Sequence, residues 1–405
     1  MLDTYRVLDL TDERGFLCGK ILGDLGADVI KVERPGGDPA RRIGPFYHDI
    51  PDPEKSLNWF AFNGSKRGVT LNIEDSGGKD IFLKLVNNAD IIIESSSPGY
   101  MDGLGLGYGT LSERNPRLIM TSITPFGQTG PYKDRKASDI DLLAMSGLIS
   151  LTGDPDRPPL KMCLEQSYYF GSTHAAVGTL MALQFRHASG EGQHVDVSIY
   201  ETLVRLNYRE PFRWEFEKAM TSRAGNIFTR GDPGQRMLWP CKDGYISWGF
   251  VPDKGQISSF VNWMKEEGMA GSWGKVAWDE TVIEDIDKEE LIKLQEAIVS
   301  FISTRTSQEL ETAALERRIR ISPVNTVDFL EKDEQLISRG FWKSVEHPEL
   351  DTEITYPGFT YLASEGENEI RFRAPLIGEH NSEFYGEELG LSEENITSLK
   401  ERGII

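Results

Sequence analysis

Three arginines follow the second apolar run of the sequence and are of a type that binds phosphate or carboxylate groups. They are Arg34, Arg41 and Arg42. The run itself, Asp28–Glu33, is joined to an earlier run, Val7–Leu10, by a helix predicted over Gly15–Leu25 that Gly26 ends. Two strands joined by one helix open a parallel sheet, and ligands of such sheets bind beyond the carboxyl ends of the strands. The arginines therefore fall where an anion would bind.

A second group of basic residues precedes another apolar run. The letters NGSKR end with Lys66 and Arg67, which are expected in a loop just before a strand predicted over Val69–Ile73. Lys136 follows the turn-forming segment Gly127–Tyr132 (GQTGPY). Ammonium and guanidinium groups in loops suit phosphate oxygens. The alternative is a set of solvated side chains, since the surface is the usual place of lysine.

Length, charge and cysteine usage restrict the classes of protein that remain. The chain has 405 residues, enough for a large core and for two or three domains. Its 64 acidic and 44 basic residues give a net charge of −20, which disfavours nucleic acid and anionic membranes as partners. No apolar run reaches the roughly 20 residues that span a bilayer, and no secretory leader is visible. The cysteines form no CxxC pair and the histidines no metal motif, so we expect a cytoplasmic protein without a metal.

The order of predicted elements indicates an α/β fold. Strands are predicted over Asp90–Glu94, Leu118–Ile123 and His194–Val197, and a long helix over Gly171–His187. Alternating strands and helices favour a parallel sheet with helices on both faces. Beyond about residue 225 the alternation gives way to helices rich in Trp, Glu and Lys, which we interpret as a smaller α+β domain.

The amino-acid sequences of these segments are also specific to one kind of protein. The chain opens with VLDL, continues with a helix ending DLGADVIKVE, and then has the turn GDPARRIGP. This opening resembles that of the class III CoA-transferases, the family of formyl-CoA transferase, carnitine CoA-transferase and α-methylacyl-CoA racemase. Further resemblance lies in ISPVNTV (Ile321–Val327) and APLIGEH (Ala374–His380). It covers nearly the whole chain and is weakest between residues 200 and 320.

The resemblance implies a fold and a ligand. It implies a doubly wound α/β large domain built from both termini, residues 1–220 and 321–405, with a smaller α+β domain at 221–320 inserted. Family members pair as two interlocked rings. No cofactor is expected to be tightly bound, because coenzyme A or acyl-CoA enters as a substrate. The residues that the resemblance places near CoA are Arg34, Arg41, Arg42, Lys66, Arg67 and Lys136.

The family's catalytic aspartate is missing. It belongs to a D-x-x-x-G segment just before the long helix, and four residues before Gly171 the chain has Ser167. In the family that carboxylate attacks the acyl-CoA thioester and forms a mixed anhydride, which releases the CoA thiolate. A serine ester would be too stable to pass the acyl group to another carboxylate. The nearest carboxylate, Glu165, would point roughly 200° away from position 167 on a helix, so it is only a fallback nucleophile.

Other positions that approach CoA in the family have changed as well. After the ADIIIE strand the family often has Asn, Phe and Arg where this chain has Ser95, Ser96 and Gly103. The motifs of the fold are kept while the residues of the site have changed, which indicates a retained fold whose active site has lost its catalytic function.

Three hypotheses remain. The chain is a subunit of a heteromeric class III CoA-transferase, inactive alone, whose related partner subunit carries the catalytic aspartate. The complex would then move CoA between an acyl-CoA such as succinyl-CoA and a carboxylic acid such as benzylsuccinate. Alternatively, it is a competent homodimeric transferase or acyl-CoA racemase that uses Glu165. The third is a non-catalytic regulatory protein that binds an acyl-CoA.

Overall fold

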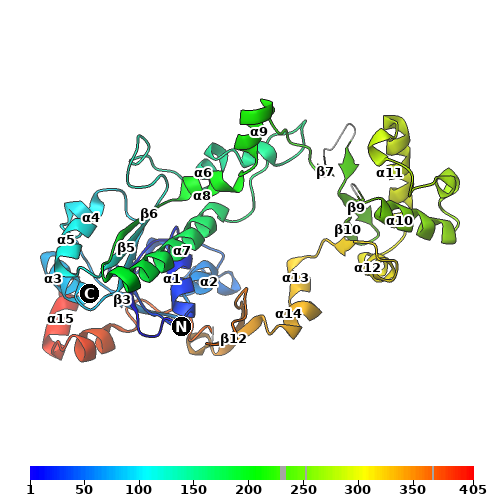
Figure 1. The fold of residues 1–405 in the computed structure, drawn as a ribbon. Coiled ribbons are helices and arrows are strands. Elements are labelled where there is room, and N and C mark those ends of the chain that lie inside the picture. Colours follow the sequence, from blue (N-terminus) through cyan, green and yellow to red (C-terminus); the bar gives the residue numbers. More distant parts are fainter. Residues whose placement is uncertain (229–233, 251–252, 367–368) are drawn as a thin grey trace. The chain divides into compact units, whose positions relative to one another are not determined.

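The computed structural model describes residues 1–228, 234–250, 253–366 and 369–405. Within them the chain divides into two compact units (Figure 1). The first unit comprises residues 1–149, 161–219 and 334–405, so both termini belong to it. The second comprises residues 150–160 and 220–333, so it takes in residues 150–160 and 321–333 beyond the boundaries expected from sequence.

A six-stranded parallel sheet forms the centre of the first unit. Its strands are β1 (Arg6–Leu10), β2 (Asp28–Glu33), β3 (Lys66–Thr70), β4 (Ile91–Glu94), β5 (Ile119–Thr124) and β6 (His194–Ser198). They lie in the order β3-β2-β1-β4-β5-β6, and all neighbouring pairs are parallel. This order reverses direction between β1 and β4 and defines a doubly wound sheet. The predicted fold class is confirmed.

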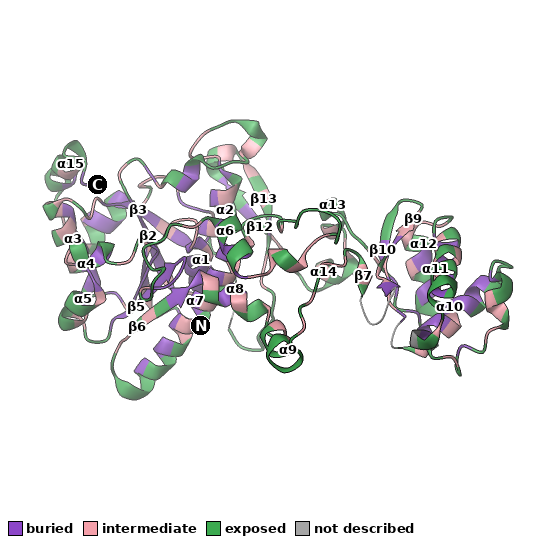
Figure 2. Ribbon diagram, turned by 90° about the horizontal axis from the view of Figure 1, so that it is seen from above, coloured by how far each residue is buried: buried purple, intermediate pink, exposed green. Residues whose placement is uncertain are grey.

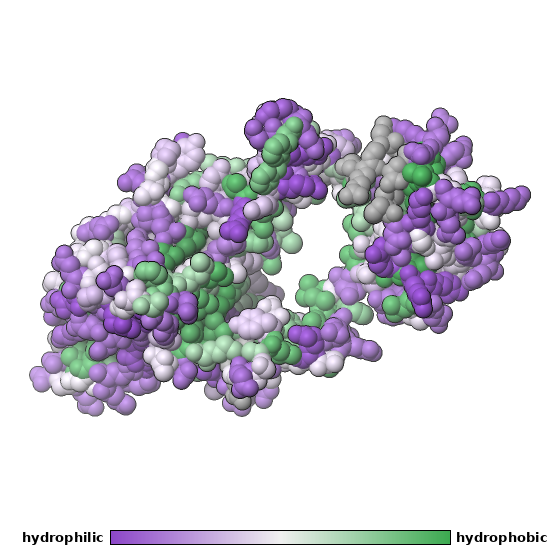
Figure 3. Space-filling view, viewed as in Figure 1, coloured by the Kyte–Doolittle hydropathy of each residue, from purple (hydrophilic) through white to green (hydrophobic). Residues whose placement is uncertain are grey.

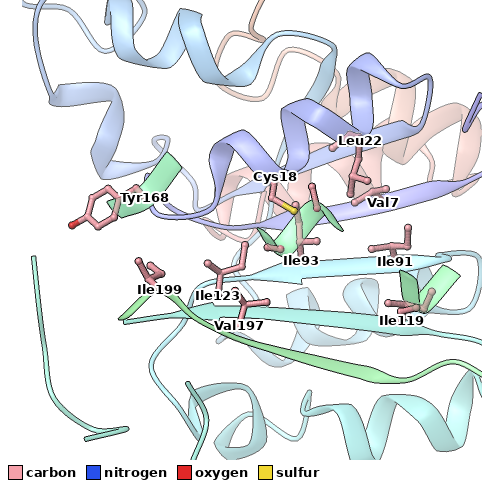
Figure 4. Packing of buried hydrophobic residues seen from close by; sticks show 14 of the residues in the cluster. Val7, Cys18, Leu22, Ile91, Ile93, Ile119, Ile123, Tyr168, Val197 and Ile199 are labelled. Atoms are coloured by element: carbon pink, nitrogen blue, oxygen red, sulfur yellow. The ribbon is translucent and has the colours of Figure 1, made fainter. Parts of the chain in front are cut away.

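Helices cover both faces of this sheet, which is why β2, β4 and β5 are buried along almost their whole length. All four residues of β4, Ile91–Glu94, are buried. Figure 2 shows buried residues, in purple, concentrated at the sheet of the first unit. Val7 and Leu8 on β1 point to opposite faces and enter different clusters. Figure 4 shows the cluster of Val7, in which Cys18 and Leu22 of α1 pack against the strands. The helices of this face are α1 (Phe16–Asp24), α6 (Asp139–Met145), α7 (Gln166–Ser189) and α8 (Ile199–Leu206).

The opposite face is covered by elements from both ends of the chain. They are α3 (Ser76–Val86), α4 (Tyr100–Gly103), α5 (Tyr108–Arg114), a π-helical turn over Glu383–Glu388 and α15 (Glu393–Glu401). The first unit also contains α2 (Leu57–Asn63), α9 (Glu210–Glu217), α14 (Glu334–Ser338) and the hairpin of β12 (Trp342–His347) and β13 (Thr352–Pro357).

The C-terminal segment closes the edge of the sheet at β3. The backbone N–H of Thr70 donates to Asn381 Oδ1 at 2.9 Å, and the Tyr385 hydroxyl donates to Thr70 O at 2.7 Å. The backbone N–H of Gly68 is bonded to His380 Nδ1 at 3.1 Å. An edge strand otherwise exposes a row of unpaired backbone groups, so these contacts complete the sheet.

The second unit has its own aromatic core. Its antiparallel sheet consists of β9 (Leu238–Cys241), β10 (Gly244–Ser247) and β11 (Ser322–Pro323), beside the short pair β7 (Ile227–Phe228) and β8 (Gln235–Arg236). Helices α10 (Lys254–Glu266), α11 (Lys288–Ile302) and α12 (Ser307–Glu316) pack on it, followed by α13 (Val327–Leu330). Trp239, Trp248 and Phe260 are almost fully buried there. This unit folds around its own core, as an independent domain does.

Two predicted elements differ from the structure. Lys66 and Arg67 are the first residues of β3 and not part of a loop, because β3 begins three residues earlier than its apolar letters suggest. The segment Ser198–Lys218, whose Glu, Arg and aromatic residues predict one helix leaving the sheet, forms two helices, α8 and α9. Among the helices in the described residues, none has both the length and the apolar composition needed to cross a bilayer.

Helix α1 lies unusually close to the sheet at Gly19. A Cβ atom on Gly19 would be 2.1 Å from Asp9 Oδ2 and 3.0 Å from Lys66 Nζ. These two buried side chains form an ion pair of 2.8 Å directly below the helix. Only glycine leaves room for the pair at this position.

We therefore expect Gly19→Ala to lower the free energy of unfolding by about 1 to 3 kcal/mol, the usual cost of overpacking a core. Urea unfolding followed by tryptophan fluorescence would measure it. Gly103→Ala is the matched control, because a Cβ at Gly103 of α4 meets nothing within 4 Å. The control should be neutral or slightly stabilising. Equal losses in both variants would contradict this packing.

Candidate functional site

A cavity of about 800 Å³ lies at the carboxyl ends of the strands where the sheet reverses direction. Segments that follow β1, β2, β3 and β4 line it. This is the position at which doubly wound sheets bind ligands. Its polar lining residues include Asp12, Glu13, Arg14, Glu33, Arg34, Asp38, Asn72, Glu74, Ser95, Ser96, Ser97 and Tyr100.

Carboxylates outnumber cations in this cavity. Arg14 is paired with Asp12. Burial, and next the Asp12 carboxylate, raises the pKa of Glu13. Arg34 is exposed, and among the described residues no hydrogen bond or ion pair occupies its guanidinium. Binding of an anionic ligand in this cavity would therefore depend on Arg34, and on Arg14 as far as Asp12 does not neutralise its charge.

Arg41 and Lys66, two of the basic residues predicted to meet CoA, are occupied by internal partners. Arg41 is fully buried, pairs with Glu33 at 2.6 Å and with Glu54 at 2.7 Å, and has no exposed side-chain surface. Lys66 is equally buried and pairs with Asp9 at 2.8 Å. Burial lowers the pKa of Lys66 to about 8, although Asp9 opposes this. Both groups fill structural positions in this chain.

The remaining predicted basic residues lie at three separate places. Arg67 pairs with Asp28 at 2.8 Å and with Glu383 at 2.9 Å, at the start of β3 and away from the carboxyl ends. Arg42 is exposed in the turn after β2, and Lys136 is exposed in the segment between β5 and α6. Of the six predicted residues, the cavity lining contains Arg34.

The side chain at position 167 is buried and hydrogen-bonded to a neighbouring carboxylate. Ser167 is fully buried in the first turn of α7, and its hydroxyl donates to Asp139 Oδ1 at 2.7 Å. Its backbone N–H donates to the same oxygen at 2.9 Å. Lys161 Nζ lies 3.3 Å from Asp139 Oδ2, and this oxygen accepts no hydrogen bond from the residues that the structure describes. The serine therefore faces the interior and not the solvent.

Glu165, the fallback nucleophile, lies on the other side of this turn. It is exposed at the N-terminal end of α7, where its carbonyl accepts from the Tyr168 N–H at 3.0 Å. Burial, and next the Glu165 carboxylate, raises the pKa of Tyr169 to about 12. Glu165 is exposed and Ser167 is buried, and Glu165 precedes the first helical residue, so the spacing of a helix does not set its direction.

The loop between β1 and α1 joins the cavity to the start of α7. Ser172 Oγ on α7 donates to Arg14 O at 2.8 Å, and Glu13 and Arg14 act on the pKa of Tyr168, which burial raises to about 12. Sequence reasoning missed Glu13 and Arg14, although they follow the carboxyl end of β1. It also missed Asp139, which lies 28 residues before Ser167 and whose contact only the fold reveals.

Comparisons with known proteins agree with this architecture. The pattern of CoA-transferase family III matches residues 2–381. The subunit BbsE of succinyl-CoA:(R)-benzylsuccinate CoA-transferase from Thauera aromatica is 34% identical over 94% of this chain and 92% of its own length. Succinyl-CoA–D-citramalate CoA-transferase from Chloroflexus aurantiacus is 30% identical over 100% of this chain and 98% of its own.

A solved structure has the same fold. A CAIB/BAIF family protein from Brucella suis has a TM-score of 0.84 and 27% identity, over 95% of this chain and 98% of that one. The chain belongs to CoA-transferase family III. Its members use CoA thioesters as substrates. Within the described residues, no group of three or more His, Cys, Asp or Glu side chains is arranged to hold a metal ion.

The contact between Ser167 and Asp139 gives a prediction for a second carboxylate placed at position 167. Ser167→Asp should bring two buried carboxylates together and lower the free energy of unfolding by about 3 kcal/mol, the scale of an uncompensated buried charge. Urea unfolding would measure this. The double variant Ser167→Asp with Asp139→Asn should recover at least half of the loss, since an amide can donate to the new carboxylate. A single variant as stable as the wild type would contradict the closed geometry.

Proposed function

We propose that this chain is a non-catalytic subunit of a class III CoA-transferase, and that a related partner subunit supplies the catalytic aspartate. The observation that carries the proposal is Ser167, which is fully buried and hydrogen-bonds to the buried Asp139. The family's D-x-x-x-G spacing, counted back from Gly171, supports this serine as the residue at the nucleophile position. The complex would move CoA from succinyl-CoA to a carboxylic acid such as benzylsuccinate. The names of the two curated relatives support succinyl-CoA as the donor.

The chemistry of the reaction supports an inactive role for Ser167. Transfer between two carboxylic acids needs an anhydride, whose leaving group is a carboxylate, and a serine would give an alkyl ester instead. Ser167 also has no histidine base at hand. His174 is seven residues along α7, and its Nδ1 is hydrogen-bonded to Phe170 O at 2.9 Å.

Exposed apolar side chains on the first unit support a partner. On α7, Val177, Met181 and Phe185 recur every four residues and are 51%, 68% and 53% exposed. On α9, Phe212 and Phe216 are 55% and 81% exposed. Much of the remaining surface in Figure 3 is hydrophilic. Apolar residues gathered on a helix face mark an interaction surface. The proposed pairing is the interlocked-ring dimer, with residues 1–220 and 321–405 as its large domain and 221–320 as its small one.

CoA is proposed to bind at the cavity between β1 and β4. Arg34 within the cavity, with the exposed Arg42 and Lys136 as further candidates, would meet its phosphate groups. Arg14 is added to this set because it lines the same cavity. Arg41, Lys66 and Arg67 would act indirectly, since each already has a carboxylate partner.

The competent enzyme remains a second candidate because of one observation. Glu165 is an exposed carboxylate at the N-terminal end of a long helix, two residues from the vacant position. A homodimeric transferase or racemase would use it as the nucleophile. A regulatory acyl-CoA-binding protein is the third candidate, and it would bind CoA as a stable homodimer without supporting transfer in any complex.

The first prediction of this proposal concerns activity. The chain alone should show no CoA transfer, and a complex with its partner should be active. In that complex Ser167→Ala and Glu165→Gln should each leave kcat within about twofold, because neither residue forms the anhydride. Steady-state kinetics would measure this.

Covalent trapping separates the candidates. Treatment with acyl-CoA and then hydroxylamine or borohydride, followed by mass spectrometry of both subunits, should modify an aspartate of the partner only. An adduct on Glu165 would instead establish the competent enzyme. CoA binding by a lone homodimer, with no activity in any complex, would favour the regulatory protein.

The second prediction concerns the cavity. Arg34→Ala should weaken CoA binding by about 1 to 3 kcal/mol, the range for a charge-assisted hydrogen bond. Isothermal titration of the purified protein with CoA would measure it. Arg209→Ala is the control, because the Arg209 side chain is 81% exposed and lies on another part of the first unit. Unchanged affinity in Arg34→Ala would exclude this arginine as a CoA contact.

A further inference from the structure

Three buried charges lie under the start of α1, beside the cavity but not in its lining. Asp9, Lys31 and Lys66 come from β1, β2 and β3, and each has 0% of its surface exposed. Lys66 Nζ is 2.8 Å and Lys31 Nζ 3.6 Å from the Asp9 carboxylate. Two ammonium groups against one carboxylate leave a net positive charge in the core. Such a charge needs further acceptors to be tolerated.

Two of the acceptors are backbone carbonyls at the ends of the loop between β1 and α1, residues 11–15. Lys31 Nζ donates to Thr11 O, where the loop begins. Lys66 Nζ donates to Phe16 O at 2.9 Å, where the loop ends. Asp9 Oδ1 in turn accepts from the N–H and the hydroxyl of Thr11, at 2.9 and 2.6 Å. The three charges therefore hold both ends of one short loop.

The middle of the same loop is held from the cavity side. The Asp12 N–H donates to Ser95 Oγ at 2.8 Å, and Arg14 Nη2 donates to Ser95 O at 2.7 Å. Ser172 of α7 donates to Arg14 O at 2.8 Å. The loop is thus fixed between the end of β4 and α7, with Asp12, Glu13 and Arg14 in the cavity wall.

We propose that Lys66 and Asp9 are positioning residues that hold the β1–α1 loop in the shape that presents Arg14 to the acyl-CoA. The inference rests on the proposed function in one respect, namely that the cavity binds CoA. Lys66 contacts no ligand in this arrangement, because its ammonium already donates to Asp9 Oδ2, Phe16 O and Asn63 Oδ1. An ammonium group has three donors, so none is left for a phosphate.

The test compares two buried lysines near the same helix. Lys66→Met removes the ammonium that is tied to the loop. Lys20→Met removes the ammonium that pairs with Asp24 within α1, where both side chains are about nine-tenths buried. Among the described residues, neither side chain has a hydrogen bond or ion pair to the loop. Hydrogen–deuterium exchange of the ligand-free protein, read on peptides covering residues 11–16, reports the loop without any ligand. Titration with CoA then reports binding.

Both variants should lose stability, but only Lys66→Met should exchange at residues 11–16 at least about tenfold faster than the rest of α1, as the loss of one charge-assisted hydrogen bond allows. Its CoA affinity should fall about tenfold, whereas that of Lys20→Met should not change. Loop exchange that is unchanged, or equally fast in both variants, would overturn the proposal, and lost CoA binding with an unchanged loop would mean that Lys66 touches the ligand.

A milder variant covers the case in which Lys66→Met does not fold. Thr11→Val removes the hydroxyl donor to Asp9 Oδ1 and keeps the shape of the side chain. Its loop peptide should also exchange faster than that of Lys20→Met, and equal exchange would overturn the proposal. A wild-type chain that binds no CoA would contradict the proposed function, while faster exchange in Lys66→Met would still support the positioning of the loop.

Discussion

The ion pair between Asp9 and Lys66 is the interaction on which much of the first unit depends. A buried charge without a partner is very unfavourable, so everything around this pair has to keep it satisfied. Gly19 leaves it room below α1, Asn63 at the end of α2 accepts a hydrogen bond from it, and the Phe16 ring lies 5.5 Å from the lysine ammonium. The ion pair also explains why Lys66, which the sequence alone suggests as a phosphate ligand, lies in the core.

The strands and the fold class could be predicted from the sequence because they depend on local composition. The apolar residues of β4, and those of the segment DVIKVE in β2, directly predict that these strands are buried. The long helix predicted from Gly171 begins at Gln166 in the structure, so Ser167 lies in its first turn and not before it. The buried ion pair of Lys66 with Asp9 and the hydrogen bond of Ser167 to Asp139 could not be predicted, because they depend on which residues the fold brings together. Lys66 and its partner Asp9 are 57 residues apart in the sequence, and Ser167 and its partner Asp139 are 28 residues apart.

The molecule as a whole and its cavity both contain more negative than positive groups. A net charge of −20 is spread over the surface, and carboxylates also outnumber cations where an anionic ligand is proposed to bind. The buried Arg41 is neutralised inside the protein by Glu33 and Glu54 and is not available to a ligand. Affinity for a phosphate-rich ligand would thus rest on very few groups, and it should be sensitive to salt.

The closure of β3 by the last part of the chain has a consequence for synthesis. Gly68 and Thr70 are made before their partners His380, Asn381 and Tyr385, which follow more than three hundred residues later in the chain. The sheet therefore keeps an open edge while more than three hundred residues are added, including the whole second unit, which has its own core. Domains fold as units during synthesis. The second unit can thus be complete before the first is closed, and an unprotected strand edge during that interval is a point at which nascent chains are open to mispairing.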